Sequence, residues 1–136
     1  MHKLREFSPP VEDMVTIYTS YVRSILEQSC SILHSSLTQE DSEDLERVEK
    51  SAMRISMQDD YTNYEEALEY LMLAKLSDRR EKLSLKFAQK CTNNALTSDL
   101  FPLNNERNKE KYKVTFANTD RLKNSAVPYL QRLLNR

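Results

Sequence analysis

The chain has 136 residues, of which 39% are hydrophobic and 30% are charged, and its net charge is −1. This length is enough for one domain with a modest core. The chain contains no glycine. That excludes the Walker loop, the Rossmann fingerprint and the nucleophile elbow, because each needs glycine where the backbone approaches a ligand or turns sharply.

Charge is distributed unevenly along the sequence. Residues 1–74 carry 6 Lys or Arg and 15 Asp or Glu, whereas residues 75–136 carry 14 and 6, so the two parts have net charges of −9 and +8. Such a split indicates either two regions that attract each other or a basic surface for a polyanion. The sequence leaves both interpretations open.

The two cysteines and the amino terminus suggest the compartment. Cys30 and Cys91 are far apart and follow no metal-binding spacing, so we expect reduced thiols in an intracellular protein, cytoplasmic or nuclear. The first residues, MHKLREF, lack the apolar region of a signal peptide. No apolar run approaches the ~20 residues that span a bilayer, so no membrane contact is expected, and no cofactor is indicated.

The first predicted element is a long helix that follows Pro9 and Pro10 and extends over residues 11–33. Apolar side chains recur there every three or four positions, which is typical of a helix with one buried stripe. The stripe consists of Val11, Met14, Val15, Tyr18, Tyr21, Val22, Ile25, Leu26, Ser29 and Leu33.

A second helix is predicted to begin after Thr38, the first residue of the capping-box pattern TQED. Its inward positions would be Leu45, Val48, Ala52 and Ile55, and its outer face would be acidic. The sequence Asp59-Asp60-Tyr61 then predicts a turn.

Two more helices are predicted, capped by Thr62 and by Ser77. The third would bury Ala67, Leu68, Leu71 and Met72. The fourth would bury Leu83, Phe87, Ala88 and Cys91, and would place its cations on other faces: Arg79, Arg80, Lys82, Lys86 and Lys90.

The helical period ends after Asn94. Residues 95–119 predict a loop with an extended piece at residues 112–116, and Ser125 is predicted to cap a last helix with Pro128 in its first turn. We therefore predict an all-α fold, a small bundle of about five helices with an irregular basic arm before the last helix. Residues 1–94 would form the bundle, and residues 95–136 the basic arm and closing helix of the same domain.

Three patterns are superficially similar to catalytic or metal-binding sites. MQDD (Met57 to Asp60) is similar to the Tyr-x-Asp-Asp motif that binds Mg²⁺ in polymerases, but its flanks are helical and we interpret it as a turn. Cys30 and His34 share a helix face, yet a structural zinc needs four ligands. His34 beside Ser35 and Ser36 has no acidic residue to orient it. We identify no catalytic and no metal-binding residue.

The basic segment from Arg107 to Arg132 is the strongest candidate for binding. Dense cations displace counterions from phosphates, and the interleaved aromatic residues Tyr112 and Phe116 offer surfaces for base stacking. Three acidic residues dilute the run: Glu106, Glu110 and Asp120.

Four stretches follow one another along the chain: VEDMVTIYTSYVRSILEQSC (11–30), HSSLTQEDSEDLERVEKSAMRI (34–55), YEEALEYLMLAKLSDRREKLSLKFAQKC (64–91) and RLKNSAVPYLQRLLN (121–135). In this order they resemble the carboxy-terminal part of reverse transcriptases from non-LTR retrotransposons, jockey-like elements in particular. The resemblance covers nearly the whole chain. Its last stretch matches the family's basic tail R-x-KNS-x-x-P through Arg121, Lys123, Asn124, Ser125 and Pro128.

The resemblance implies a fragment of an RNA-directed DNA polymerase, with helices like those of the thumb followed by a post-thumb extension. The family's catalytic aspartates lie outside the matched part, so the fragment would not be an enzyme on its own. The implied role is sequence-independent contact with the backbone of an RNA–DNA hybrid or RNA, or docking to the rest of a reverse transcriptase. The expected phosphate contacts are Lys109, Lys111, Lys113, Arg121, Lys123 and Arg132, with Asn124 as a hydrogen-bond donor.

The alternative is a helical module that binds another protein or itself and has no role with nucleic acid. Its acidic second helix would pair with the basic fourth helix, within the chain or across a dimer. The acidic residues of that helix are Glu40, Asp41, Glu43, Asp44, Glu46 and Glu49.

Overall fold

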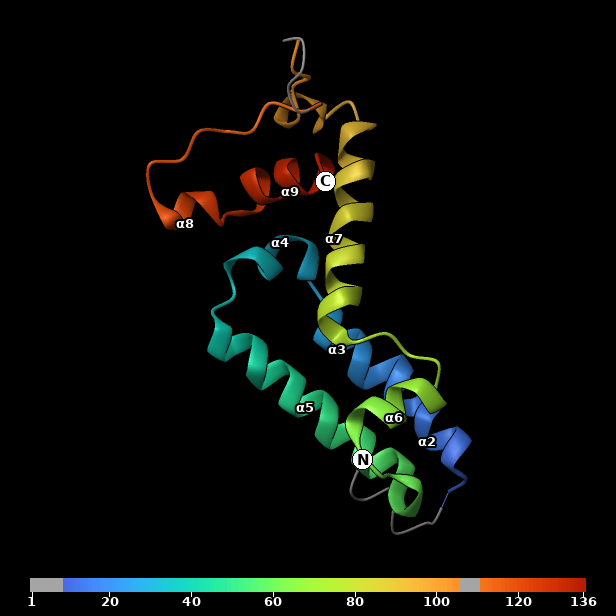
Figure 1. Ribbon diagram of the computed structural model, residues 1–136. Coiled ribbons are helices and arrows are strands. Elements are labelled where there is room, and N and C mark those ends of the chain that lie inside the picture. Colours follow the sequence, from blue (N-terminus) through green and yellow to red (C-terminus); the bar gives the residue numbers. More distant parts are fainter. Residues whose placement is uncertain (1–8, 106–110) are drawn as a thin grey trace. The chain divides into compact units, whose positions relative to one another are not determined.

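A computed structural model describes residues 9–105 and 111–136 of the chain (Figure 1). These residues are mostly helical, and within them β-structure is limited to an isolated antiparallel bridge between Leu103 and Tyr112. The predicted all-α fold is therefore confirmed. In the same ranges, no helix combines the length and the apolar character that crossing a membrane requires.

The chain divides into two compact units. The acidic unit comprises Met1–Gln28 and Thr38–Arg79, and the basic unit comprises Ser29–Leu37 and Arg80–Arg136. Counted over the sequence, the acidic unit carries 8 Lys or Arg and 16 Asp or Glu, a net charge of −8, and the basic unit carries 12 and 5, a net charge of +7. The charge split of the sequence thus follows the structural division, which is not the division at residue 94 drawn from the sequence.

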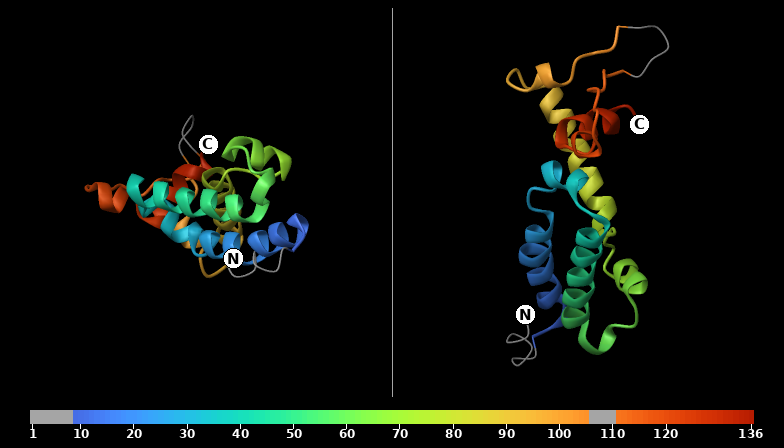
Figure 2. Two further views of the ribbon diagram at one scale, coloured as in Figure 1. Left: turned by 90° about the horizontal axis from the view of Figure 1, so that it is seen from below. Right: turned by 90° about the vertical axis from the view of Figure 1, so that its left-hand side faces the viewer.

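The acidic unit is built on two long helical segments that lie side by side (Figure 2). The first runs through α2 (Val11–Ile17), the π-helical turn η1 (Tyr18–Val22) and α3 (Arg23–Glu27), and the second is α5 (Gln39–Met57). The turn η3 (Gln58–Asp60), the helix α6 (Tyr64–Tyr70) and the first residues of α7 (Leu76–Thr92) complete the unit. Its core consists of Tyr18, Ala52, Met53, Met57, Tyr64, Ala67 and Leu68.

The first helix differs from its prediction in length and in buried face. It ends at Glu27, and α4 (Cys30–Leu33) is a separate short helix that follows Ser29. Tyr21 and Ile25 are 69% and 68% exposed, although both belong to the predicted stripe. The physical reason is the π-helical turn, whose wider spiral shifts the register of the side chains that follow it.

The start of α5 is confirmed in detail. Thr38 Oγ1 accepts a hydrogen bond from the Asp41 backbone N–H at 3.1 Å, and Asp41 Oδ2 accepts one from the Thr38 N–H at 3.1 Å. The predicted inward face is only partly correct, because Ala52 is buried but Val48 is 50% exposed. The buried positions form a different helical stripe: Glu49, Ala52, Met53, Ser56 and Met57.

Two other predicted caps are displaced, the first by one residue and the second by two. Asn63, rather than Thr62, caps α6 by accepting a hydrogen bond from the Glu66 N–H at 2.8 Å. Ser77 lies inside α7, which begins at Leu76. Met72 was predicted to be buried and is 94% exposed.

The absence of glycine leaves other residues at left-handed backbone positions. Ser29, Gln58 and Met72 have φ angles of 56°, 51° and 52°. A left-handed conformation costs a non-glycine residue about 1–2 kcal/mol, so the chain forms these helix ends at an energetic cost.

The basic unit packs short segments against α7 and α9 (Ala126–Leu134). It contains α4, the 3₁₀ turns η2 (His34–Ser36) and η4 (Ser98–Leu100), and α8 (Asp120–Lys123), which the sequence did not predict. Both α4 and η2 contact α9. The predicted position of Ser125 at the start of α9 is confirmed. The core consists of Ala88, Cys91, Phe101, Leu130 and Leu133.

Candidate nucleic-acid interface

The basic arm is fixed at its base by backbone pairing. The Lys113 N–H donates to the Pro102 carbonyl at 2.9 Å, and the Asn104 N–H donates to the Lys111 carbonyl at 2.9 Å. The two lysine side chains are exposed. Their backbone is therefore held in place while their ammonium groups remain in solvent.

Two amide side chains of the last helical segment hold the arm further along. Asn135 accepts a hydrogen bond from the Tyr112 N–H at 2.8 Å and donates one to the Tyr112 carbonyl at 2.9 Å. Gln131, which is 1% exposed, accepts from the Thr115 N–H at 2.7 Å and donates to the Leu100 carbonyl at 2.6 Å. Because both anchors are neutral, they fix the arm without neutralising its cations.

The predicted phosphate contacts fall into three groups. Lys111, Lys113, Arg121 and Lys123 are exposed, and none of them pairs with a carboxylate in the part of the chain that the structure describes. Lys109 lies outside the described residues.

Arg132 and Asn124 lie close to α8. Arg132 is partly buried, and its Nη2 donates to the Lys123 carbonyl at 2.7 Å, so it ties α9 to the end of α8. Asn124 is exposed at the carboxyl end of α8. Five of the seven predicted residues are thus exposed on the arm and at α8. Arg132 instead makes a contact that stabilises the fold.

The two aromatic residues of the arm have different surroundings. Tyr112 is partly buried against the core of the basic unit, and the Lys111 ammonium lies 5.3 Å from the centroid of its ring. Phe116 is 84% exposed. Of the two, only Phe116 presents its ring to a ligand without rearrangement.

A row of lysines on α7 was not among the predicted contacts. Lys82, Lys86 and Lys90 are all exposed, and their spacing of four residues places them on one face of the helix. The row is about 12 Å long at 1.5 Å per residue. The four-residue spacing was the sequence signal that pointed to it.

In the alternative interpretation, the acidic helix pairs with the basic fourth helix. One of its six acidic side chains, Glu49, is fully buried and therefore cannot form such a pair. Glu49 Oε1 accepts a hydrogen bond from the Tyr18 hydroxyl at 2.8 Å, and Oε2 accepts one from the Tyr64 hydroxyl. Burial, together with the hydrogen bond to Glu49, raises the pKa of both tyrosines far above the usual value. Both hydroxyls therefore stay protonated and continue to donate.

Arginines complete this buried cluster. Arg23, which is 4% exposed, places its Nε 3.9 Å from Glu49 Oε1 and 3.2 Å from Glu27 Oε1, and also donates to the Ala74 carbonyl. Arg79, whose side chain is exposed, pairs with Glu27 at the edge of the cluster. The cluster joins α3, α5, α6 and the start of α7, and this gives it a structural role.

The remaining sequence patterns have ordinary surroundings. Asp59 and Asp60 lie exposed in the turn η3, as predicted for MQDD. Cys30 is buried, and the His34 ring contacts the Tyr129 ring edge-on at 6.0 Å between centroids. Within residues 9–105 and 111–136, no three His, Cys, Asp or Glu side chains come together as a potential metal site.

No family model matches this chain, and comparison with curated proteins and with solved structures finds no match either.

Proposed function

We propose that the basic unit binds the sugar–phosphate backbone of a nucleic acid without reading its sequence, as the residual role of a fragment of a non-LTR retrotransposon reverse transcriptase. The observation that carries the proposal is the exposed set Lys111, Lys113, Arg121 and Lys123, held on an anchored arm and on α8. Unpaired cations are what releases counterions from a phosphate backbone.

The net charge of +7 on the basic unit supports the same proposal. A surface with net positive charge attracts a polyanion, and the rate of association falls with ionic strength. The assignment to a reverse transcriptase depends on the four resembling stretches, and it gives the chain a positioning role with no catalytic step.

The test is binding of a labelled RNA–DNA hybrid over a series of salt concentrations. Replacing Lys111, Lys113 and Lys123 by Gln should reduce the slope of log affinity against log salt by about two to three units. Each phosphate contact contributes up to about 0.9 to that slope on B-DNA. Circular dichroism checks that the variant is folded.

The matched control is the replacement of Lys82, Lys86 and Lys90 by Gln, which removes the same number of charges from the same unit. An equal loss of slope in both variants would mean that net charge, not the arm, drives binding. No binding by the folded wild-type chain would refute the proposal and favour the alternative, in which the charges serve the fold or a protein partner.

A further inference from the structure

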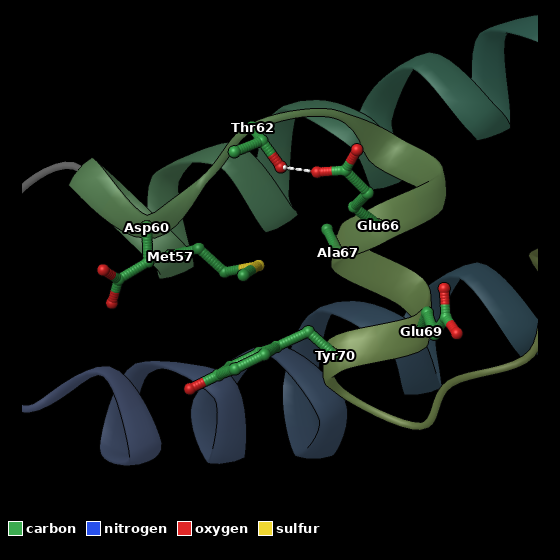
Figure 3. A pocket seen from close by; sticks show the side chains of 7 residues that line it. All are labelled: Met57, Asp60, Thr62, Glu66, Ala67, Glu69 and Tyr70. Atoms are coloured by element: carbon green, nitrogen blue, oxygen red, sulfur yellow. Dashed lines mark hydrogen bonds between the residues drawn. The ribbon is translucent and has the colours of Figure 1, made fainter.

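The acidic unit contains a hollow that neither the fold nor nucleic-acid binding uses. It has a volume of about 480 Å³ and lies between the end of α5, η3 and α6 (Figure 3). Its floor is apolar, formed by the buried side chains of Met57 and Ala67, and the ring of Tyr70 forms one wall. We call it the Tyr70 pocket.

Large apolar side chains around the Tyr70 pocket are exposed to solvent. Tyr70 is 71% exposed, and Met72, two residues further along, is 94% exposed. A second hollow of about 440 Å³, lined by Pro10, Val11, Glu12, Val15 and Leu71, also has Tyr70 in its lining. Large exposed apolar side chains beside a hollow are a feature of interaction sites.

The rim of the Tyr70 pocket is negatively charged. Asp60, Glu66 and Glu69 line it, and none of the lining residues that the structure describes is a cation. Glu66 accepts a hydrogen bond from the Thr62 hydroxyl, as Figure 3 shows, and its hydrogen bonds with Thr62 and Asn63 lower its pKa, so it stays ionised at neutral pH. An apolar floor under an anionic rim repels phosphates and selects a partner segment that carries an apolar side chain beside cations.

The basic arm of this same chain has that composition. Phe116 is 84% exposed, and Lys111 and Lys113 precede it on the arm as exposed, unpaired cations within the described residues. A phenylalanine ring fits a hollow of this volume, where it would contact the Met57 thioether and the Tyr70 ring, both favourable partners for an aromatic group.

We propose that the Tyr70 pocket binds the basic arm of a second copy of this chain, with Phe116 in the pocket and the arm's lysines at its acidic rim. The net charges of the two units, −8 and +7, are complementary across such a contact. The contact joins two different surfaces, so it is heterologous. It does not depend on nucleic-acid binding.

The first test is sedimentation equilibrium of the nucleic-acid-free chain at about 0.05 M and 0.5 M salt, because screening weakens exposed charge pairs. We expect self-association that weakens with salt. The pocket variant Asp60→Asn, Glu66→Gln, Glu69→Gln and the arm variant Lys111→Gln, Lys113→Gln, Phe116→Ala should each raise the dissociation constant by at least about tenfold. The charge-matched control Glu40→Gln, Glu43→Gln, Asp44→Asn on α5 should not.

The decisive test is complementation. Each variant alone should associate at least about tenfold more weakly than the wild type. An equimolar mixture should form complexes with the wild-type dissociation constant, because the intact arm of the pocket variant meets the intact pocket of the arm variant. A wild-type chain that stays monomeric, association that survives both variants, or folded variants that do not complement each other would overturn the proposal. The pocket variant keeps its arm and should bind the RNA–DNA hybrid like the wild type, so failure of this proposal is distinguishable from failure of nucleic-acid binding.

Discussion

The acidic unit buries a carboxylate that joins its helices, whereas two neutral amides anchor the arm of the basic unit. In the acidic unit, the fully buried Glu49 accepts hydrogen bonds from two tyrosine hydroxyls and lies beside the guanidinium of Arg23. In the basic unit, Gln131 and Asn135 bind backbone groups of the arm and of η4. The buried carboxylate thus lies in the unit with net negative charge, and the amide anchors lie beside the exposed cations of the arm.

The difference has a consequence for function. A carboxylate anchor near the arm would attract Lys111 and Lys113 and reduce their availability to a ligand. Neutral amides hold the same backbone without that competition. The arm therefore keeps Lys111 and Lys113 at the surface, while the acidic unit uses part of its charge to hold helices together.

The largest effect is expected from removing the buried carboxylate of the acidic unit. Glu49→Ala leaves the Tyr18 and Tyr64 hydroxyls without their acceptor and weakens the pairing of Arg23. We expect a loss of about 3–5 kcal/mol in the free energy of unfolding of this unit. Urea denaturation measures it.

The control is Glu43→Ala on the same helix, where the side chain is exposed and the change should be within about 0.5 kcal/mol. Amide hydrogen exchange reports the stability of each unit separately. If Glu49→Ala were no more destabilising than Glu43→Ala, the buried cluster would not hold the acidic unit together.

A smaller effect is expected from removing the amide of the basic unit. Gln131→Ala leaves the Thr115 N–H and the Leu100 carbonyl without partners, at a cost of about 1–3 kcal/mol. The exchange of the Thr115 amide should accelerate, and nucleic-acid binding should weaken because the arm is less ordered.

The exposed glutamine Gln89 on α7 provides the matched control, and Gln89→Ala should leave Thr115 exchange unchanged. Unchanged exchange in the Gln131→Ala variant would contradict the anchoring role. It would also remove the contrast between the two units.

The comparison also separates what the sequence predicts from what it does not. The capping box at Thr38 was predicted because it depends on residues within one turn of each other. The burial of Glu49 was not, because an acidic residue among five others on one helix is typical of a solvated face. Its partners Tyr18, Arg23 and Tyr64 lie on other segments, and only the tertiary fold brings them together.

The candidate interface follows the same division. The exposure of Lys111, Lys113, Arg121 and Lys123 could be predicted from composition, since lysine and arginine are seldom buried. The amides that position the arm, Gln131 and Asn135, carry no such sequence signal. Nor could the shift of Tyr21 and Ile25 to the surface be predicted, because a π-helical turn leaves no clear pattern in a single sequence.

The two units also differ in how the first turns of α5 and α9 are capped. The Thr38 side chain caps α5, whereas the Ser125 hydroxyl at the start of α9 donates to the Leu122 carbonyl and caps no N–H. Thr38→Ala should therefore cost about 1 kcal/mol, and Ser125→Ala should cost less. Chemical denaturation compares the two variants, and equal costs would show that the cap at Thr38 contributes no specific stability.

The smallest effect is a pH dependence confined to the basic unit. His34 packs against Tyr129, and its Nδ1 is buried without a hydrogen-bond partner among the described residues. Burial, reinforced by the Arg80 guanidinium and opposed by Glu81, lowers the pKa of His34 below its usual 6.5. As the pH falls through about 6.5, the unfolded chain takes up a proton before the folded chain does, so stability is lost until the pH reaches the lower folded pKa. The loss is small because the imidazole is only partly buried.

Amide exchange of α9 between pH 7.5 and 5 should reveal this loss of stability in the wild type and its absence in His34→Gln. The same slope in both proteins would mean that another group titrates.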